Sequence, residues 1–422
     1  MKKVVLPILL LGLAAGLSAA DIVRDIVGFA PERPHSYDQF MAAVEQLAAS
    51  PRISAENIGF SRKGRPLVLL AVHAPELPSL DPDHWPPCLF VIARQHGTES
   101  SGTEAALALL RYFATTEDET SRAILRQLTI AAVPMANPDG VAASRRSNAA
   151  DVDLNRDWGS LSQPETRAIA DAVARWQPLA IIDLHELPGS SAKPAFAQSF
   201  IQTIGRDGKI PPSTSEDCGI CSLRLAQWMR TYSFPANLYY DYSHESSALC
   251  HRYFGLTRSI PAYLFEAKTG PGHSLAERVT FHVLGALVVG NYLIHTYYDS
   301  NRPTGVAVAE APPTDQQPTE PPPAEVPPLA LEILKPTDGT VAGGEIPVVV
   351  QTQGEGFSYV TFHVDGMIRA LTTAFPYTFV LDASDYADGQ HRIDVALCND
   401  IGRPLLSKQC TITINNDAQR GE

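Results

Sequence analysis

Short apolar runs alternate with segments of helical periodicity over the first three hundred residues. Strands are predicted where the apolar runs are short and continuous, at 67–72, 89–93, 128–134, 179–184 and 262–265. Helices are predicted where apolar residues recur at helical spacing, at 41–49, 101–113 and 162–176 and from about 274 onward. Because strands and helices alternate, we expect an α/β fold with a mixed central sheet that helices flank on both faces.

Two of the predicted helices carry further signals. Ser162 and Glu165 have the spacing of a capping box, which predicts the start of the helix that runs to Trp176. The apolar stretch at 279–294 is interrupted by His282 and Gly285 and is short for a membrane span. We therefore expect a buried helix of the first domain there.

Helical periodicity vanishes after residue 328. Short strands separated by Asp-Gly turns are predicted at 346–351, 359–364, 377–381, 391–397 and 410–414. Strands at this spacing predict a β-sandwich over 329–417. The segments HVDG, PYTFVLDAS and DGQHRIDVAL resemble those of bacterial immunoglobulin-like modules, so the resemblance implies an immunoglobulin-like domain.

A proline-rich segment at 302–328 separates the two patterns. It holds nine of the 34 prolines of the chain and has no apolar periodicity. Proline fixes φ and removes backbone donors, so the segment is predicted to be an extended, semi-rigid linker.

The first twenty residues have the composition of a targeting segment. Lys2 and Lys3 precede an apolar stretch at 4–17, and small residues follow at 18–20. This arrangement predicts a signal peptide over 1–20 and therefore export to the periplasm or the extracellular space. The first domain then covers 21–301, and we expect no membrane span after cleavage.

Charge and cysteine content narrow the function classes. The chain of 422 residues has a net charge of −13 and no long basic run, so it lacks the positive surface that binds nucleic acid. Its six cysteines can pair in an exported protein, and a disulfide between Cys398 and Cys410 would join strands of the sandwich. Cys218 and Cys221 have the spacing of a metal knuckle, but without a second such pair we expect no structural zinc site.

Two His-x-x-Glu pairs occur, and only one directly follows a predicted strand. His96 and Glu99 come after the strand at 89–93, and Gly97 between them allows a sharp exit from it. The other pair, His73 and Glu76, lies in a proline-rich loop and is expected at the surface. The first pair is therefore expected at the carboxyl end of a strand, where open α/β sheets bind ligands.

A third candidate ligand, His185, ends the strand at 179–184. Two histidines and one carboxylate leave a coordination position open on zinc, which is typical of a catalytic site. Glu266 ends the strand at 262–265 and is expected at the same edge of the sheet as a general base. The alternatives for Glu266 are a surface carboxylate or a salt-bridge partner of Lys268.

These segments together resemble the zinc carboxypeptidases of the carboxypeptidase A/B type. The matching segments lie in the family's order over roughly 55–298 and read RQHGTES, NPDG, RRSNAADVDLNRDW, DLHE and YLFEAKTG. The resemblance implies a carboxypeptidase-like fold and one Zn²⁺ ion held by His96, Glu99 and His185. It implies Glu266 as the catalytic carboxylate.

The resemblance also implies roles for residues around the DLNRD segment. Asn155 and Arg156 would bind the terminal carboxylate of the substrate, which suits an amide and a guanidinium fork. Arg146, rather than its neighbour Arg145, would polarise the scissile carbonyl. Asp153 would orient His96 through its imidazole.

The chain departs from the family pattern in three places. Glu186 follows the third ligand where digestive members have Ser-Tyr, so we expect an extra carboxylate beside the metal. The family's mobile active-site tyrosine has no assigned counterpart, because an ungapped count back from Glu266 reaches His244. The tyrosines close to that position are Tyr239, Tyr240, Tyr242 and Tyr253. An ungapped count places His251 and Arg252 near the specificity pocket, which indicates an acidic side chain on the substrate.

The leading hypothesis is an exported zinc metallocarboxypeptidase that removes C-terminal residues from peptides. Alternatives are a peptidoglycan stem-peptide amidase or peptidase of the same fold, a zinc amidohydrolase of the desuccinylase or aspartoacylase type, and a non-catalytic binding module. The substrate is expected to be a peptide or peptidoglycan peptide with a free carboxylate. The C-terminal domain is expected to contact the cell surface or other proteins.

Overall fold

The computed structural model describes residues 19–74, 86–188, 199–204, 225, 236–241, 248–300 and 328–416, apart from 358, 366, 373–374 and 399–403. The predicted signal peptide lies outside these residues except for Ala19 and Ala20. The predicted linker lies outside them except for Pro328. Cys218 and Cys221 also lie outside the described residues, so their interpretation stays a prediction.

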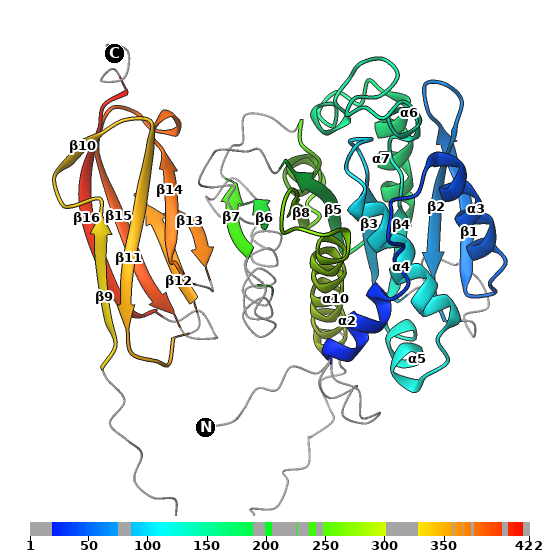
Figure 1. Ribbon diagram of the computed structural model, residues 1–422, viewed down its shortest axis with the longest axis horizontal. Coiled ribbons are helices and arrows are strands. Elements are labelled where there is room, and N and C mark those ends of the chain that lie inside the picture. The colour runs from blue at the N-terminus through cyan, green and yellow to red at the C-terminus, as the bar shows by residue number, and fades with distance from the viewer. Residues whose placement is uncertain are drawn as a thin grey trace, which may run out of the picture.

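A mixed sheet forms the centre of the first domain, in the order β1-β2-β4-β3-β5-β8-β6-β7 (Figure 1). The middle strands β4, β3, β5 and β8 are parallel to one another. The flanking pairs are antiparallel: β1 with β2, β2 with β4, and β6 with β8. The strands are β1 (Ile53–Phe60), β2 (Pro66–Val72), β3 (Cys88–Ala93), β4 (Thr129–Val133), β5 (Ala180–Leu187), β6 (Ser199–Ile204), β7 (Ala236–Asp241) and β8 (Ala262–Lys268). The predicted mixed sheet and all five predicted strands are confirmed.

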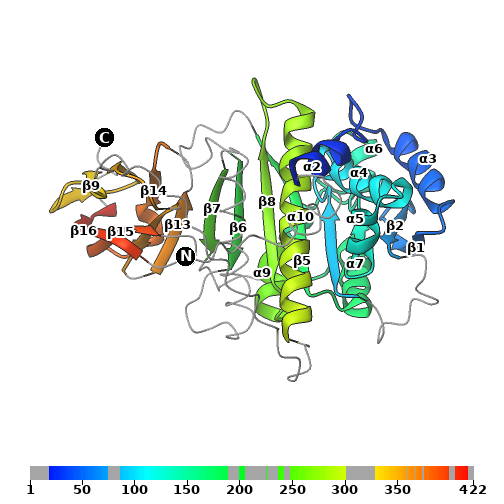
Figure 2. The same cartoon turned by 90° about the horizontal axis from the view of Figure 1, so that it is seen from below.

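Helices cover both faces of this sheet (Figures 1 and 2). One face packs on α2 (Ala19–Val27), α3 (Tyr37–Ala48), α4 (Ser101–Thr115) and α10 (Leu275–Ser300) in a single apolar cluster. The other face packs on α7 (Pro164–Trp176) and the short α9 (Cys250–Arg252). Shorter helices are α5 (Glu119–Leu125) and α6 (Pro138–Ala142).

The prediction for the start of α7 is wrong in its detail. The N-cap residue of this helix is Gln163, and its side chain makes no capping hydrogen bond. The hydroxyl of Ser162 donates to Asp157 instead, and Glu165 is buried and accepts from the backbone N–H of Arg62. Ser162 and Glu165 have the spacing of a capping box, but both side chains form hydrogen bonds with other parts of the fold instead.

The apolar stretch at 279–294 is a buried helix, as predicted. The polar interruptions have structural reasons, because His282 contacts the hydroxyl of Ser101 at 3.1 Å and Gly285 lies against the ring of Phe265. A Cβ atom at Gly285 would lie 1.9 Å from that ring, so only glycine lets α10 approach β8 this closely. Among the described residues, no helix has both the length and the apolar character needed to cross a membrane.

The C-terminal domain has two facing β-sheets with one apolar cluster formed from both (Figure 1). One sheet has the order β14-β11-β9 and the other the order β13-β12-β15-β16-β10. The strands are β9 (Ala330–Lys335), β10 (Thr340–Ala342), β11 (Glu345–Gln353), β12 (Tyr359–Val364), β13 (Met367–Thr372), β14 (Thr378–Asp382), β15 (Gly389–Cys398) and β16 (Pro404–Ile414). This arrangement is consistent with the predicted β-sandwich.

The predicted disulfide of the sandwich is absent from the structure. Cys398 pairs in register with Pro404, whereas Cys410 pairs with Ile393, and both cysteines are buried free thiols. Residues 393 and 398 are an odd number of positions apart on one strand, so they point to opposite faces of the sheet. The two thiols therefore lie on opposite faces and cannot meet.

The central sheet continues into the C-terminal domain. Strand β13 pairs antiparallel with β7, with Ala370 opposite Tyr239, Leu371 opposite Leu238 and Thr372 opposite Asn237. The two domains therefore share one continuous sheet of thirteen strands, despite the long segment between them in the sequence (Figure 2).

Candidate active site

The loop that follows β3 brings His96 and Glu99 to the carboxyl end of the parallel strands. Both side chains are buried between the end of β3 and the start of α4. Gly97 between them is required because a Cβ atom there would lie 2.2 Å from the carbonyl carbon of Gly140 and 2.5 Å from the carbonyl oxygen of Arg145. The reason for this glycine is thus the close approach of another loop rather than the sharp exit that the sequence suggested.

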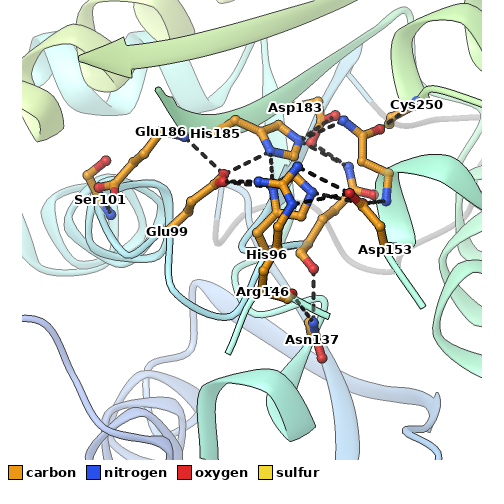
Figure 3. A network of polar contacts seen from close by, with 12 residues as sticks. His96, Glu99, Ser101, Asn137, Arg146, Asp153, Asp183, His185, Glu186 and Cys250 are labelled. Atoms are coloured by element: carbon orange, nitrogen blue, oxygen red, sulfur yellow. Dashed lines mark hydrogen bonds and ion pairs between the residues drawn. The ribbon is translucent and has the colours of Figure 1, made fainter. Parts of the chain in front are cut away.

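His185 on β5 completes a compact group with these two residues (Figure 3). The Nδ1 atom of His96 lies 2.8 Å from Oε1 of Glu99, and the Nδ1 atom of His185 lies 3.0 Å from Oε2 of the same carboxylate. The two Nδ1 atoms are 3.0 Å apart, and one candidate ligand atom from each residue lies within 4.8 Å of the others.

This donor set fits a zinc ion. Two imidazole nitrogens and a carboxylate are the ligands of an open catalytic zinc site. The two Nδ1 atoms and the carboxylate converge in a buried place, and a positive charge between them would offset the repulsion among their lone pairs. The predicted metal residues His96, Glu99 and His185 are therefore together and have suitable chemistry.

Each histidine directs its second nitrogen to a different aspartate. The Nε2 atom of His96 lies 2.9 Å from Oδ1 of Asp153, and the Nε2 atom of His185 lies 3.0 Å from Oδ2 of Asp183. Asp153 was predicted in this position, whereas Asp183 was missed. The spacing in the sequence could have indicated Asp183, because it stands two residues before His185 on β5 and residues two apart on a strand point to the same face.

Buried polar side chains surround the Nε2 atom of His185. The amide of Gln95 donates to Asp183 at 2.7 Å, and its carbonyl oxygen accepts from the indole of Trp158 at 2.7 Å. The side-chain oxygen of Asn155 accepts from the backbone N–H of Cys250 at 2.9 Å, and its Nδ2 atom lies 3.3 Å from His185. These contacts fix the imidazole in one orientation.

Glu186 does not place its carboxylate beside the metal ligands, contrary to the sequence expectation. Its side chain points to the other face of the sheet, where it accepts from the backbone N–H of Ser101 at 2.9 Å and pairs with Arg278 of α10. Only its backbone reaches the candidate site, since the N–H of Glu186 donates to Glu99 at 3.0 Å. The parity of β5 explains this, because Glu186 is one residue beyond His185.

Glu266 lies on β8 directly opposite His185 in the sheet register. Its half-buried side chain lines the same cleft as His96. Burial, opposed by His185 and reinforced by the charge of Glu99, raises the pKa of Glu266 to about 7. A carboxylate in this environment can accept and return a proton near neutral pH.

Arg146 is the one of the two neighbouring arginines that reaches the candidate metal ligands. Its guanidinium lies 3.0 Å from Oε1 of Glu99 and 3.1 Å from Oδ2 of Asp153, and 46% of its side chain is exposed. Arg145 instead donates to the backbone carbonyl of Asn148 at 3.1 Å. Arg146 is therefore the arginine beside the candidate ligands, and its role toward the scissile carbonyl stays a prediction.

A cleft of about 380 Å³ lies above these residues, on the face of the sheet opposite α10. Its polar wall contains the predicted residues Arg146, Asn155 and Arg156, the last of which is exposed. Its apolar wall is formed by Leu187, Phe200, Tyr239, Leu249 and Leu264.

The predicted acidic preference finds no support in this lining. His251 is fully buried in α9, and neither His251 nor Arg252 is among the residues that line the cleft. Of the tyrosine candidates, Tyr239 lines the cleft, while Tyr253 is buried against Trp158. The side chain of Tyr240, and Tyr242 and His244, lie outside the described residues.

Similarity to known proteins agrees with this geometry. The sequence profile of the zinc carboxypeptidase family matches residues 37–194. Carboxypeptidase 2 of Trichophyton tonsurans is 35% identical over 97 residues, which are 23% of this chain and 18% of that protein. Carboxypeptidase SOL1 of Arabidopsis thaliana is 34% identical over 95 residues, which are 20% of this chain and 19% of that protein. The chain thus spans about a fifth of the length of these relatives.

A solved structure is similar to this fold over a longer stretch. The metallo-carboxypeptidase from Burkholderia cenocepacia has a TM-score of 0.51 and 22% sequence identity, covering 63% of this chain and 70% of that chain. At this identity the likeness concerns the fold, and it extends beyond the 158 residues that the family profile matches. The carboxypeptidase-like fold predicted from the sequence is confirmed, and residues 37–194 of this chain match the sequence profile of the zinc carboxypeptidase family.

Proposed function

We propose that this chain hydrolyses the C-terminal peptide bond of peptides that carry a free carboxylate. The observation that supports this most is the composition of one cleft. A zinc-type ligand group, a carboxylate with a raised pKa and two arginines all reach it. An exopeptidase needs these three parts together, because it must recognise a chain end and cleave the bond next to it.

Zinc would be held by Nδ1 of His96, the carboxylate of Glu99 and Nδ1 of His185. When bound, zinc supplies a Lewis acid that polarises a carbonyl group and makes water more acidic. Asp153 accepts a hydrogen bond from Nε2 of His96 and leaves its Nδ1 available as a ligand. The charge of Asp183, 3.0 Å from Nε2 of His185, favours a proton on that nitrogen and so leaves Nδ1 of His185 available in the same way.

The proton transfers are assigned to Glu266. Its carboxylate takes a proton from the attacking water and later delivers that proton to the leaving amine. Arg146 offers its exposed guanidinium to the negative charge that develops on the scissile oxygen. Arg156 pairs with the substrate carboxylate, and the side-chain amide of Asn155, which also lines the cleft, adds a hydrogen bond to it.

Export and the nature of the C-terminal domain remain parts of this proposal. The signal peptide predicted at 1–20 would be removed, so the mature protein from the exported fraction should begin near Asp21 when its N-terminus is read by mass spectrometry. The immunoglobulin-like assignment of 329–417 is supported by the two facing sheets.

Hydrolysis by the zinc-loaded protein tests the proposed reaction. The substrates are N-blocked dipeptides with a free C-terminus, the same dipeptides amidated at the C-terminus, muropeptides, and N-acylated amino acids. We expect turnover of the free-carboxylate dipeptides and a loss of at least a hundredfold on amidation, because Arg156 would lose its ion pair. Glu266→Gln should lower kcat by about 10²–10⁴-fold without loss of zinc.

The control is Asp171→Asn, which removes an exposed carboxylate of α7 that does not line the cleft and should leave kcat unchanged. Equal rates on free and amidated ends would contradict the carboxypeptidase assignment. Turnover of muropeptides alone would favour the peptidoglycan enzyme, and turnover of N-acylated amino acids alone would favour the amidohydrolase. Peptide binding without hydrolysis by any zinc-loaded preparation would favour a binding module.

A further inference from the structure

One wall of the cleft belongs to the C-terminal domain. Phe379 and Val380, both on β14, line the cleft together with His96, Arg156 and Glu266. The cleft is therefore bounded by both domains, although the sequence predicted it within the first domain alone.

The shared sheet explains how β14 reaches the cleft. Phe200, Gln202 and Tyr239 line the floor between β8 and the sandwich, and the register pairs Phe200 with Glu266 and Gln202 with Tyr239. Tyr239 packs on the apolar cluster of the sandwich and contacts the ring of Phe200 at 5.3 Å. Strands β6 and β7 thus connect the catalytic residues to the sandwich without a break (Figure 2).

The cleft meets β14 along the edge of that strand. Phe379 and Val380 are consecutive and so point to opposite faces of their sheet, yet both line the cleft. Among the described strands, β14 is the outermost of the order β14-β11-β9 and pairs only with β11. The cleft therefore runs past the side of β14 that has no strand partner in the described sheet.

We propose that the C-terminal β-sandwich is a fixed wall of the substrate cleft and that β14 selects peptides with an apolar side chain beside the scissile bond. The selectivity part rests on the proposed function. Val380 is half-buried and Phe379 is 9% exposed, so the two present a rigid apolar edge. The rest of the described wall near them, Phe200, Tyr239 and Leu264, carries no formal charge.

Apolar contact area explains the direction of this selectivity. Burial of an apolar side chain such as Leu or Phe against this edge is favourable, whereas a charged side chain facing the same edge would lose water without gaining a partner. The domain would then act in every turnover as part of the site, in addition to any contact with the cell surface.

The first experiment places a charge on the proposed wall. In the full chain, Val380→Lys should lower kcat/KM for substrates with C-terminal or penultimate Leu and Phe by at least tenfold. It should shift the ratio of Glu to Leu substrates at least tenfold toward Glu. The matched control is Thr378→Lys, which puts the same charge on an exposed position of the same strand outside the lining. Thermal unfolding checks that both variants fold, and unchanged selectivity in a folded Val380→Lys variant would overturn the proposal.

The second experiment does not depend on activity. Thr372 and Asn237 are paired across β13 and β7, and directly opposed antiparallel positions have Cβ atoms about 4.5–5.5 Å apart, close enough for a disulfide after a small shift. Asn237→Cys with Thr372→Cys in the full chain should give a bridged peptide on mild oxidation. The control couples Asn237→Cys with Thr413→Cys on β16, which is four strands away from β7 and therefore about 19 Å from it.

If the folded chain forms no disulfide between positions 237 and 372, the proposal that the C-terminal domain is a fixed wall of the cleft is wrong, whatever activity the enzyme has. A bridge together with a selectivity shift supports the whole proposal. A bridge in a protein whose wild type hydrolyses none of the substrates supports the docked wall and rejects the proposed function, so the two failures are distinguishable.

Discussion

The carboxylate of Asp183 lies 3.0 Å from Nε2 of His185, and this contact mirrors the 2.9 Å contact between Asp153 and His96. The two aspartates come from different elements, since Asp183 is on β5 and Asp153 precedes the short 3₁₀ turn Leu154–Arg156. Asp183 is 1% exposed, whereas a quarter of the Asp153 side chain is exposed. A buried acceptor holds its imidazole more rigidly, so we expect His185 to be the better fixed ligand.

Asp183→Asn should weaken zinc binding by about 10–100-fold, because the carboxamide can no longer fix the tautomer of His185 with a charged acceptor. Competition with a chromogenic chelator measures the zinc affinity. Asp153→Asn should give a smaller loss in the same assay, since its carboxylate is more exposed. Equal zinc affinity of wild type and Asp183→Asn would show that the contact does not orient the ligand.

Gly97→Ala should disrupt the site without touching a ligand. The added Cβ would lie 2.2 Å from the carbonyl carbon of Gly140, so the loop that carries His96 and Glu99 must move away. We expect a zinc affinity at least tenfold lower and a free energy of unfolding lower by about 1–3 kcal/mol. The neighbouring exposed Thr98 provides the control, because Thr98→Ala removes side-chain atoms without a clash. Normal zinc binding by Gly97→Ala would mean that the two loops are not held together.

The candidate ligands could be predicted because each stands at or just beyond the end of an apolar strand. The end of a strand can be recognised from the sequence around it. Because β3, β5 and β8 are parallel neighbours, their carboxyl ends bring His96, His185 and Glu266 to one edge of the sheet. The expectation for Glu186 was wrong because adjacent residues of a strand point to opposite faces of the sheet, so Glu186 cannot share the face of His185. The wall formed by β14 could not be predicted, since the β7–β13 pairing joins residues more than 120 positions apart.

Glu186→Gln tests the correction directly. Glu186 is buried with Arg278 behind the sheet, so loss of its charge should leave a cation without its partner and lower the free energy of unfolding by about 2–3 kcal/mol. Zinc affinity and kcat/KM should change by less than about threefold, because the side chain does not face the ligands. Denaturant unfolding and the chelator assay measure the two quantities. A tenfold loss of zinc affinity with unchanged stability would restore the original interpretation of Glu186.

The sandwich contains a histidine whose protonation should stabilise it. His391 contacts Oδ2 of Asp365 at 2.7 Å through Nδ1 and the carbonyl of Ala387 at 2.8 Å through Nε2, so both ring nitrogens face acceptors. Burial opposes the charged form, but the hydrogen bonds to Asp365 and Ala387 outweigh it and raise the pKa of His391 above its ordinary value of 6.5.

A raised pKa in the folded state means that the stabilisation is fully present below about pH 6.5 and is lost as the pH rises through the folded pKa of His391. Because 46% of the Asp365 side chain is exposed, water screens the pair, and we expect at most about 1 kcal/mol. Hydrogen exchange of the β15 amides, compared between wild type and His391→Gln at each pH, removes the intrinsic pH effect on exchange. Protection of the wild type should exceed that of His391→Gln by up to about fivefold at pH 5.5, and the ratio should fall toward one at pH 9. A ratio that stays constant over this range would mean that the proton on His391 contributes nothing to the sandwich.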